Sequence, residues 1–275
     1  MKNRFYLFAI LLPIFLFQLP CTFLTPSTGA AKGIKSTKVS SLTLDLNTTP
    51  TTIYENSAFT LAATIKNPGS EVATNIKIKA VRESGDFTLD ESEKSLNDLE
   101  PKKTSSQSWN VNAGKRSGKL SVTLKYNYLT KASGDILIYD WDKVKLSKKL
   151  TDEFKASAGI LSFEGSNAPV EVSVEDSGPL NYSSTHTKDK IKFFVKDKGN
   201  GLVTDMKVNV MIKIKDNYCK NKEFVTLNPE GSAEIECNID LQKPSDYKTS
   251  IPFQVEVSYT YETSASKEIS LVKSA

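Results

Sequence analysis

Two cysteines, Cys219 and Cys237, have the spacing that best supports a defined chemistry in this sequence of 275 residues. Between them lies Leu227-Asn228-Pro229, which is typical of a turn. In an exported chain such a pair is expected to form a disulfide, joining neighbouring strands or a strand and a loop. Two alternatives stay open: a pair of reduced buried thiols, and a zinc site, which would still need ligands because no further Cys or His lies nearby.

The sequence holds one histidine, His186, in the polar stretch Ser183-Ser184-Thr185-His186-Thr187. A histidine that acts as a catalytic base needs a nucleophile and a group that orients its ring. The chain has no G-x-S-x-G motif and no glycine loop of the kind that binds phosphate. We therefore interpret His186 as a solvated loop residue, and we expect no enzymatic activity, no cofactor and no metal.

Two pairs of carboxylates have the spacing i, i+2, which places both groups on one face of a strand: Asp140 with Asp142, and Glu91 with Glu93. Paired carboxylates perform glycoside hydrolysis. The first pair lies in Tyr139-Asp140-Trp141-Asp142, a segment that also suggests calcium, although the spacing of an EF-hand is absent. We interpret both pairs as solvent-exposed charges.

Two tryptophans offer rings on which a sugar would stack. Trp109 alternates with Val111, a pattern that predicts a core position in a sheet. Trp141 lies among Asp and Lys residues and is predicted to be exposed. A single exposed ring is no extended platform for a polysaccharide.

Two segments match the acceptor pattern for N-linked glycans, Asn47-Thr48-Thr49 and Asn181-Tyr182-Ser183. We expect both asparagines in the turn that follows the first strand of a repeat. Asn47 and Asn181 are therefore the candidate glycosylation sites.

Apolar residues alternate with polar ones over most of the chain, as in Leu42-x-Leu44-x-Leu46 and Ile76-x-Ile78-x-Ala80. A period of two predicts strands with one buried face and one solvent-exposed face. No segment sustains a helical period, and the nearest candidate, residues 146–158, is short and rich in charged residues. The pattern predicts an all-β chain with short strands and frequent turns, as in antiparallel immunoglobulin-like β-sandwiches.

The sequence contains an internal repeat. Residues 59–81 (FTLAATIKNPGSEVATNIKIKAV) match residues 191–212 (IKFFVKDKGNGLVTDMKVNVMI), with Asn67-Pro68-Gly69 aligned to Asp197-Lys198-Gly199 at an offset of 130. Three further blocks keep a similar offset: Leu42, Leu44 and Asp45 with Val172, Val174 and Glu175; Leu99-Glu100-Pro101 with Leu227-Asn228-Pro229; Tyr126-Asn127-Tyr128 with Tyr259-Thr260-Tyr261. The repeat predicts two tandem domains, residues 38–146 and 168–275, joined by a linker or extra strand at 147–167.

The first 31 residues have the pattern of a secretory signal. Lys2 and Arg4 precede the uncharged run Phe5 to Phe17, and small residues follow at 27–31. We expect cleavage after Ala30 or Ala31; the alternative is a retained membrane anchor, because the apolar stretch continues to Leu24. Either outcome predicts export, with the membrane contacted only by this segment. Cys21 lacks the small preceding residues of a lipid-attachment site.

The charge balance argues against nucleic acid as a partner. The formal net charge of +4 includes Lys2 and Arg4; without them 34 basic residues (36 minus 2) face 32 acidic ones. A chain so close to neutral lacks the basic stripe of a nucleic-acid-binding protein.

The order of the repeated motifs resembles a known group of modules. Asn67-x-Gly69 followed by Ala73-x-Asn75, Leu99-x-Pro101 and the Tyr-x-Tyr strand are similar to CARDB-type and related immunoglobulin-like modules of bacterial and archaeal surface and S-layer-associated proteins. In the second copy Asp197 replaces the asparagine. The resemblance implies surface adhesion or spacer domains with no catalytic residues. The expected partners are envelope or surface proteins, in adhesion or as an accessory subunit of an envelope or appendage complex, or a polysaccharide.

Overall fold

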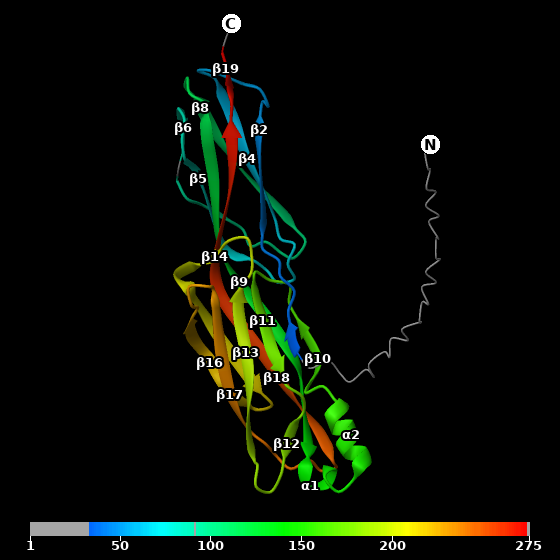
Figure 1. The fold of residues 1–275 in the computed structure, drawn as a ribbon. Coiled ribbons are helices and arrows are strands. Elements are labelled where there is room, and N and C mark those ends of the chain that lie inside the picture. The colour runs from blue at the N-terminus through cyan, green and yellow to red at the C-terminus, as the bar shows by residue number, and fades with distance from the viewer. Residues whose placement is uncertain (1–32, 91, 274–275) are drawn as a thin grey trace, which may run out of the picture.

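The computed structural model describes residues 33–90 and 92–273 (Figure 1). Strands form most of this part of the chain and lie in several mainly antiparallel sheets, which confirms the all-β prediction. The predicted signal or anchor at residues 1–31 lies outside the described residues. Within the described part, no helix is long and apolar enough to cross a membrane.

The chain forms two elongated, sandwich-like bodies stacked end to end (Figure 1). The first body has one sheet in the order β2–β4–β8–β6 and a second that includes β5 and β7. The bounds are β2 (Thr43–Thr49), β4 (Ala58–Lys66), β5 (Thr74–Arg82), β6 (Phe87–Leu89), β7 (Lys94–Leu96) and β8 (Thr104–Ala113).

The second body repeats this arrangement with later strands. One sheet has the order β1–β11–β13–β17, and the other includes β15 and β16. The bounds are β1 (Gly33–Ser36), β11 (Val170–Asp176), β13 (Lys188–Asp197), β15 (Lys207–Ile214), β16 (Asn217–Thr226) and β17 (Ser232–Asp240). The order β2–β4–β8 of the first body thus recurs as β11–β13–β17.

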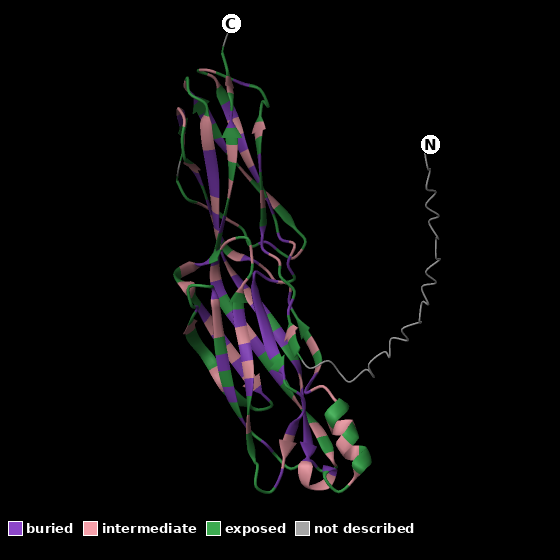
Figure 2. Cartoon of the chain, in the orientation of Figure 1, coloured by how far each residue is buried: buried purple, intermediate pink, exposed green. Residues whose placement is uncertain are grey.

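The alternation seen in the sequence produces the cores. Along β4, Phe59, Leu61, Ala63 and Ile65 are buried while the residues between them are not, and the same banding runs along most long strands (Figure 2). Neighbouring side chains of a strand point to opposite faces, so each sheet presents one apolar face to the other. Burial of these faces is the main stabilising term for both bodies.

Two long strands join the bodies. β9 (Gly118–Asp140) and β18 (Lys248–Ile269) pair antiparallel over the whole of β18, from Gly118 opposite Ile269 to Tyr139 opposite Lys248. Both strands therefore run through the junction without a break. We call this pair the β9–β18 ribbon.

Each ribbon strand contributes to both bodies. The first part of β9 pairs with β5 in the first body, and its last part pairs with β10 (Ile160–Gly165) and β12 (Leu180–Tyr182) in the second. The first part of β18 pairs with β15 in the second body, and the rest continues into the first. After it, β19 (Leu271–Val272) pairs with β3 (Ile53–Tyr54) at the far end of the first body. Neither body is complete without a strand from the other half of the sequence.

The repeat extends to backbone detail. Asn75 and Asp205, aligned by the offset of 130, both adopt positive φ angles, of 49° and 59°. In the second copy this kink follows β14 (Leu202–Val203) and forms the short 3₁₀ helix η1 (Thr204–Met206) before β15. Asparagine and aspartate tolerate this left-handed conformation better than most residues.

Two short helices lie against the end of the second body. They are α1 (Trp141–Val144) and α2 (Lys148–Ala156). Tyr139 packs edge-on against Phe154 of α2 at 5.3 Å between ring centroids, and Glu153 Oε1 accepts hydrogen bonds from Lys248 Nζ at 2.7 Å and Tyr139 Oη at 3.1 Å. The segment 147–167, predicted as a linker or extra strand, thus contains α2 and β10. The charged residues of 146–158 hid the helix, which is stabilised by these contacts and by the packing of its partly buried Leu150 and Phe154 against the end of the second body.

The ribbon predicts that both bodies unfold together. The Trp141→Phe variant leaves Trp109 as a fluorescent reporter of the first body, and Trp109→Phe leaves Trp141 as a reporter of the second. We expect the fluorescence of each variant to change at the urea midpoint that far-UV circular dichroism gives for the same variant, because loss of the ribbon opens both bodies. Fluorescence and dichroism midpoints that separate within either variant would contradict this coupling.

Candidate functional site

Four tyrosines occupy the centre of the ribbon, where the two bodies meet. Tyr128 lies opposite Tyr259 and Tyr126 opposite Tyr261, and all four are buried. The rings of Tyr126 and Tyr261 are 5.8 Å apart between centroids. Burial raises the pKa of all four hydroxyls above the ordinary value, so they stay protonated at neutral pH.

The first copy of a repeated hydrogen-bond network centres on Asn67. Tyr128 Oη donates to Asn67 Oδ1 at 3.1 Å, and the Gly69 amide donates to the same oxygen at 3.0 Å. Asn67 Nδ2 donates to the Leu99 carbonyl at 2.9 Å and to that of Glu71 at 2.8 Å. The fully buried amide thereby ties the end of β4 to the following turn and to β9.

The second copy uses a carboxylate in the same place. Tyr261 Oη donates to Asp197 Oδ1 at 3.0 Å, and the Gly199 amide donates to that oxygen at 3.3 Å. The Val203 amide donates to Asp197 Oδ2 at 3.0 Å. The Asn-x-Gly and Tyr-x-Tyr motifs of the sequence are therefore two parts of one contact, a link that sequence comparison alone did not reveal.

Further contacts fix the bodies relative to each other. The backbone N–H of Asn167 donates to Ser70 Oγ at 2.7 Å, and the backbone N–H of Asn200 donates to Ser41 Oγ at 3.1 Å. Lys131 forms an ion pair with Glu71 at 2.9 Å. The junction is thus held by side chains on both sides of the ribbon as well as by the ribbon itself.

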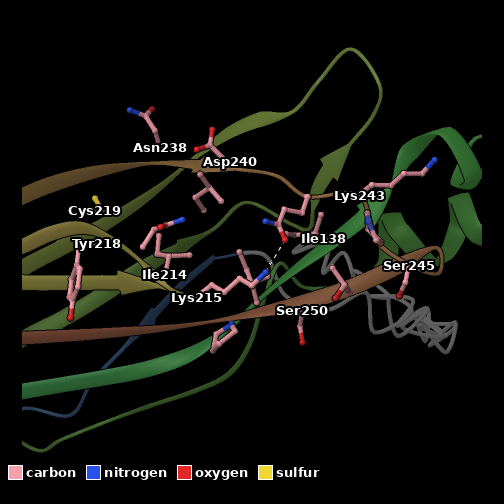
Figure 3. A pocket seen from close by; sticks show the side chains of 17 residues that line it. Ile138, Ile214, Lys215, Tyr218, Cys219, Asn238, Asp240, Lys243, Ser245 and Ser250 are labelled. Atoms are coloured by element: carbon pink, nitrogen blue, oxygen red, sulfur yellow. Dashed lines mark hydrogen bonds between the residues drawn. The ribbon is translucent and has the colours of Figure 1, made fainter.

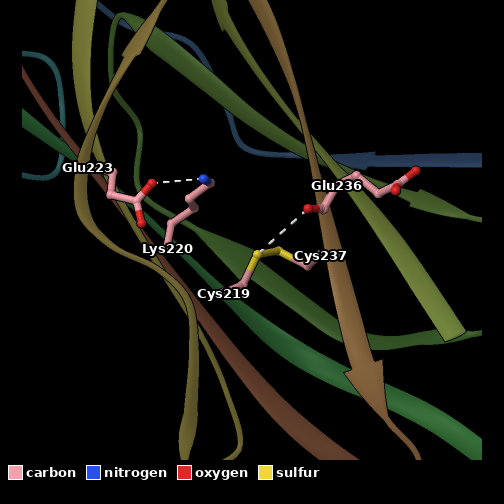
Figure 4. Close-up of a disulfide and its surroundings, with 5 residues drawn as sticks. All are labelled: Cys219, Lys220, Glu223, Glu236 and Cys237. Carbon is pink, nitrogen blue, oxygen red and sulfur yellow. Dashed lines mark hydrogen bonds and ion pairs between the residues drawn. A yellow bond between two sulfur atoms is a disulfide. The ribbon is translucent and has the colours of Figure 1, made fainter. Parts of the chain in front are cut away.

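Cys219 and Cys237 form the predicted disulfide (Figure 4). Cys219 lies on β16 and Cys237 on β17, and their Cα atoms are 5.5 Å apart. These strands are the edges of the two facing sheets of the second body. The disulfide therefore closes one open side of that body.

The first body fills the matching place with other side chains. Trp109 pairs with Leu61 in the register that Cys237 has with Ile191, and positions 61 and 191 differ by the repeat offset. Trp109 is buried, as its alternation with Val111 predicts, and Lys94 Nζ lies 5.4 Å from its ring centroid. A large ring under a lysine chain thus occupies the place of the disulfide, which explains why the first copy does without cysteines.

A cavity of about 670 Å³ lies beside the disulfide at the outer end of the second body (Figure 3). Ile138, Ile214 and Ile239 contribute apolar walls. At its rim Lys215 Nζ donates to Gln242 Oε1 at 2.8 Å. The one carboxylate of the lining, Asp240, lies 3.9 Å from Lys188, and no histidine lines the cavity. The cavity can hold an apolar group against its isoleucine walls, with polar side chains at its rim.

His186 and the first carboxylate pair, which were considered for catalysis, contact neighbouring residues of the fold. His186 is exposed, with Nε2 at 3.5 Å from Asp189 Oδ2. Asp140 was predicted to be a solvent-exposed charge, and this is wrong: it is fully buried at the start of α1, where it accepts from the Asp142 amide at 3.2 Å. Asp142 accepts from Lys145 Nζ at 2.7 Å and from the Ser184 amide at 2.9 Å, and the Lys145 hydrogen bond is the main cause of its lowered pKa.

Only one member of the second carboxylate pair, Glu93, is among the described residues. Glu93 forms an ion pair with Lys77 at 3.0 Å, and Glu91 lies outside the described residues. Trp141 was predicted to be exposed; it is half-buried, with its ring 5.3 Å from that of Phe154, because α2 covers it. In the part of the chain that the structure describes, no group of three or more His, Cys, Asp and Glu residues is arranged to hold a metal ion.

The candidate glycosylation sites lie on strands. Asn47 is exposed within β2, and Asn181 is half-buried within β12. Their predicted location in turns is therefore wrong: β2 extends to Thr49, and Asn181 lies on β12, a separate short strand that pairs with β9. Modification of Asn47 and Asn181 stays a prediction.

Comparisons with known proteins identify no family. No family model and no curated protein matches the chain. Among solved structures it was matched to the collagen adhesin CNA from S. aureus, at 9% identity over 89% of this chain and 91% of that one, with a TM-score of 0.10. A similarity this low carries no argument about fold or function. The resemblance to CARDB-type modules stays a prediction.

The tyrosine contacts predict a measurable stabilisation. We expect Tyr128→Phe and Tyr261→Phe each to lower the free energy of unfolding by about 1–2 kcal/mol, because each removes a donor from a buried or half-buried oxygen. Urea unfolding measures the loss. Tyr54→Phe is the control, because Tyr54 is exposed and its hydroxyl forms no hydrogen bond to another described residue. Equal stability of all three variants and the wild type would contradict the assignment.

The disulfide predicts a second loss of stability. The double variant Cys219→Ala/Cys237→Ala is expected to be less stable by about 3 kcal/mol, the chain-entropy estimate for a loop near the observed separation of 18 residues. Urea unfolding with and without a reductant tests this. The reductant should destabilise the wild type and leave the double variant unchanged; a wild type indifferent to complete reduction would show that the bridge adds nothing.

Proposed function

We propose that this chain is a non-catalytic exported cell-surface protein whose two immunoglobulin-like domains act in tandem as a stiff adhesion, spacer or protein-binding module. The observation that carries the proposal is the β9–β18 ribbon, which passes through the junction without a hinge. A connection of two hydrogen-bonded strands transmits orientation from one body to the other. A flexible linker, such as one that joins an enzymatic domain to a binding domain, lacks this hydrogen-bonded pair of strands.

The placement of the chain ends supports a spacer. β1 enters the sheet of the second body, while β19 lies at the far tip of the first (Figure 1). If the N-terminal segment holds the chain at a membrane, the first body is the one presented outward. Export also agrees with the disulfide, since such bonds persist in oxidising compartments.

The loops at the outer tip are well supported. The backbone N–H of Asn56 donates to the Gly114 carbonyl at 2.9 Å, and the backbone N–H of Gly114 donates to the backbone carbonyl of Asp86 at 2.6 Å. Asp86 Oδ2 also accepts from the Lys115 amide at 3.1 Å. Three loops are thereby joined into one surface, which suits recognition of a partner at the end of a sandwich.

Two measurements test the proposal with cysteine-substituted chains. Lys115→Cys places a thiol in an exposed tip loop, and Lys149→Cys places one on α2 at the opposite end. In whole cells of the source organism, a membrane-impermeant maleimide should label Lys115→Cys. Labelling only after lysis would contradict a surface location.

The second measurement addresses stiffness. With spin labels at both positions, we expect one narrow distance distribution, because the ribbon fixes the bodies. The matched control carries labels at Lys115 and Lys79, both on the first body. A distribution across the junction much broader than that of the control would rule out the stiff spacer.

A further inference from the structure

A groove of about 460 Å³ lies at the centre of the nine-stranded sheet, on its outer face. One cross-strand row runs through it. Phe224 of β16 pairs with Asn209 of β15, Asn209 with Ser258 of β18, and Ser258 with Leu129 of β9. Cross-strand partners point to the same face of a sheet, so these side chains share one surface.

Phe224 is the most unusual member of this surface. Its side chain is 76% exposed in the middle of a strand. The apolar residues at alternate positions of the neighbouring β15, in contrast, are buried on the inner face of the sheet. An exposed ring beside polar groups offers an apolar face that the C–H face of a sugar ring can cover.

The polar groups beside it keep unused hydrogen-bonding capacity. The Asn209 side chain has no hydrogen bond to any other residue that the structure describes. Thr260 Oγ1 donates to Asn127 Oδ1 at 2.9 Å, an arrangement that leaves the Asn127 amide nitrogen unbonded within the described part of the chain. Amide groups of this kind bond the hydroxyl groups of sugars without requiring a charge.

Two lysines give the groove its charge. Lys125 and Lys207 both line it, and neither forms an ion pair with a described residue, although Glu262 lies directly opposite Lys125 on β18. Asp205 is the one carboxylate in the lining. Unpaired ammonium groups around a polar surface attract carboxylates or sulfates by charge.

We propose that this groove binds an acidic polysaccharide chain, with Phe224 under one sugar ring, Asn209 and Asn127 on its hydroxyl groups, and Lys125 and Lys207 on its anionic groups. The inference rests on the proposed function, because it supplies the ligand of an adhesion module.

Addition of a peptide strand to β16 is disfavoured. The edge strand is interrupted by the positive φ of Lys222 and by register shifts against β15, which break the ladder that such a strand would extend.

The test is titration calorimetry of the purified chain with three soluble polysaccharides: polygalacturonate, which carries carboxylates; dextran sulfate, which carries sulfates; and uncharged dextran. We expect binding of at least one anionic chain and none of dextran. Phe224→Ala should weaken binding about tenfold, and the double variant Lys125→Ala/Lys207→Ala should abolish most of its salt dependence. The preferred anionic polymer identifies carboxylate or sulfate as the recognised group.

Matched variants separate the groove from general charge. Tyr218→Ala removes the other exposed aromatic ring of β16, and Lys196→Ala removes an exposed lysine from the opposite sheet. Both should bind like the wild type. Binding lost equally in all variants, binding retained in all of them, or no binding to any of the three polymers would overturn the proposal. Surface labelling of Lys115→Cys is independent of these titrations, so it separates failure of the ligand from failure of the surface location.

Discussion

The pairing of β9 with β18 is the constraint on which the rest of the structure depends. These strands close the sheets of both bodies, place the four tyrosines opposite one another and set the direction in which the two ends of the molecule point. A strand pair that crosses the junction leaves few backbone torsions free to act as a hinge. The stiffness that we assign to the molecule therefore comes from backbone hydrogen bonds, and the side-chain contacts of the junction add to it.

The tyrosine networks explain why two glycines are placed where they are. A Cβ atom on Gly69 would collide with the Tyr128 hydroxyl, and one on Gly199 would collide with that of Tyr261. Glycine at these positions lets the tyrosine reach the asparagine or aspartate two residues earlier. The contact therefore requires the tyrosine, the glycine and the asparagine or aspartate together. Because both halves of the chain contain all three, the recurrence of the motif indicates one repeated structure.

The strands, the disulfide and the repeat were predictable because local patterns encode them. Alternation places Leu61 and Ile65 inward, and an isolated cysteine pair in a chain that is predicted to be exported has few other uses. The exchange of strands between the bodies was not predictable, because nothing local distinguishes a long strand from two short strands. The buried position of Asp140 and the helix at 148–156 depend on tertiary contacts. The groove around Phe224 was missed for the same reason: its row combines four strands, and only the register brings them together.

The contribution of β18 and β19 to the first body has a consequence for how the protein is made. Most strands of the first body precede those of the second in the sequence, yet its closing strand, β18, is synthesised only after β10 to β17 of the second body. Until then the chain exposes an open sheet edge and remains without a finished domain. Because both bodies need β18, neither can be completed before this strand has been synthesised, so the strand exchange makes the folding of the first body wait for the second half of the chain.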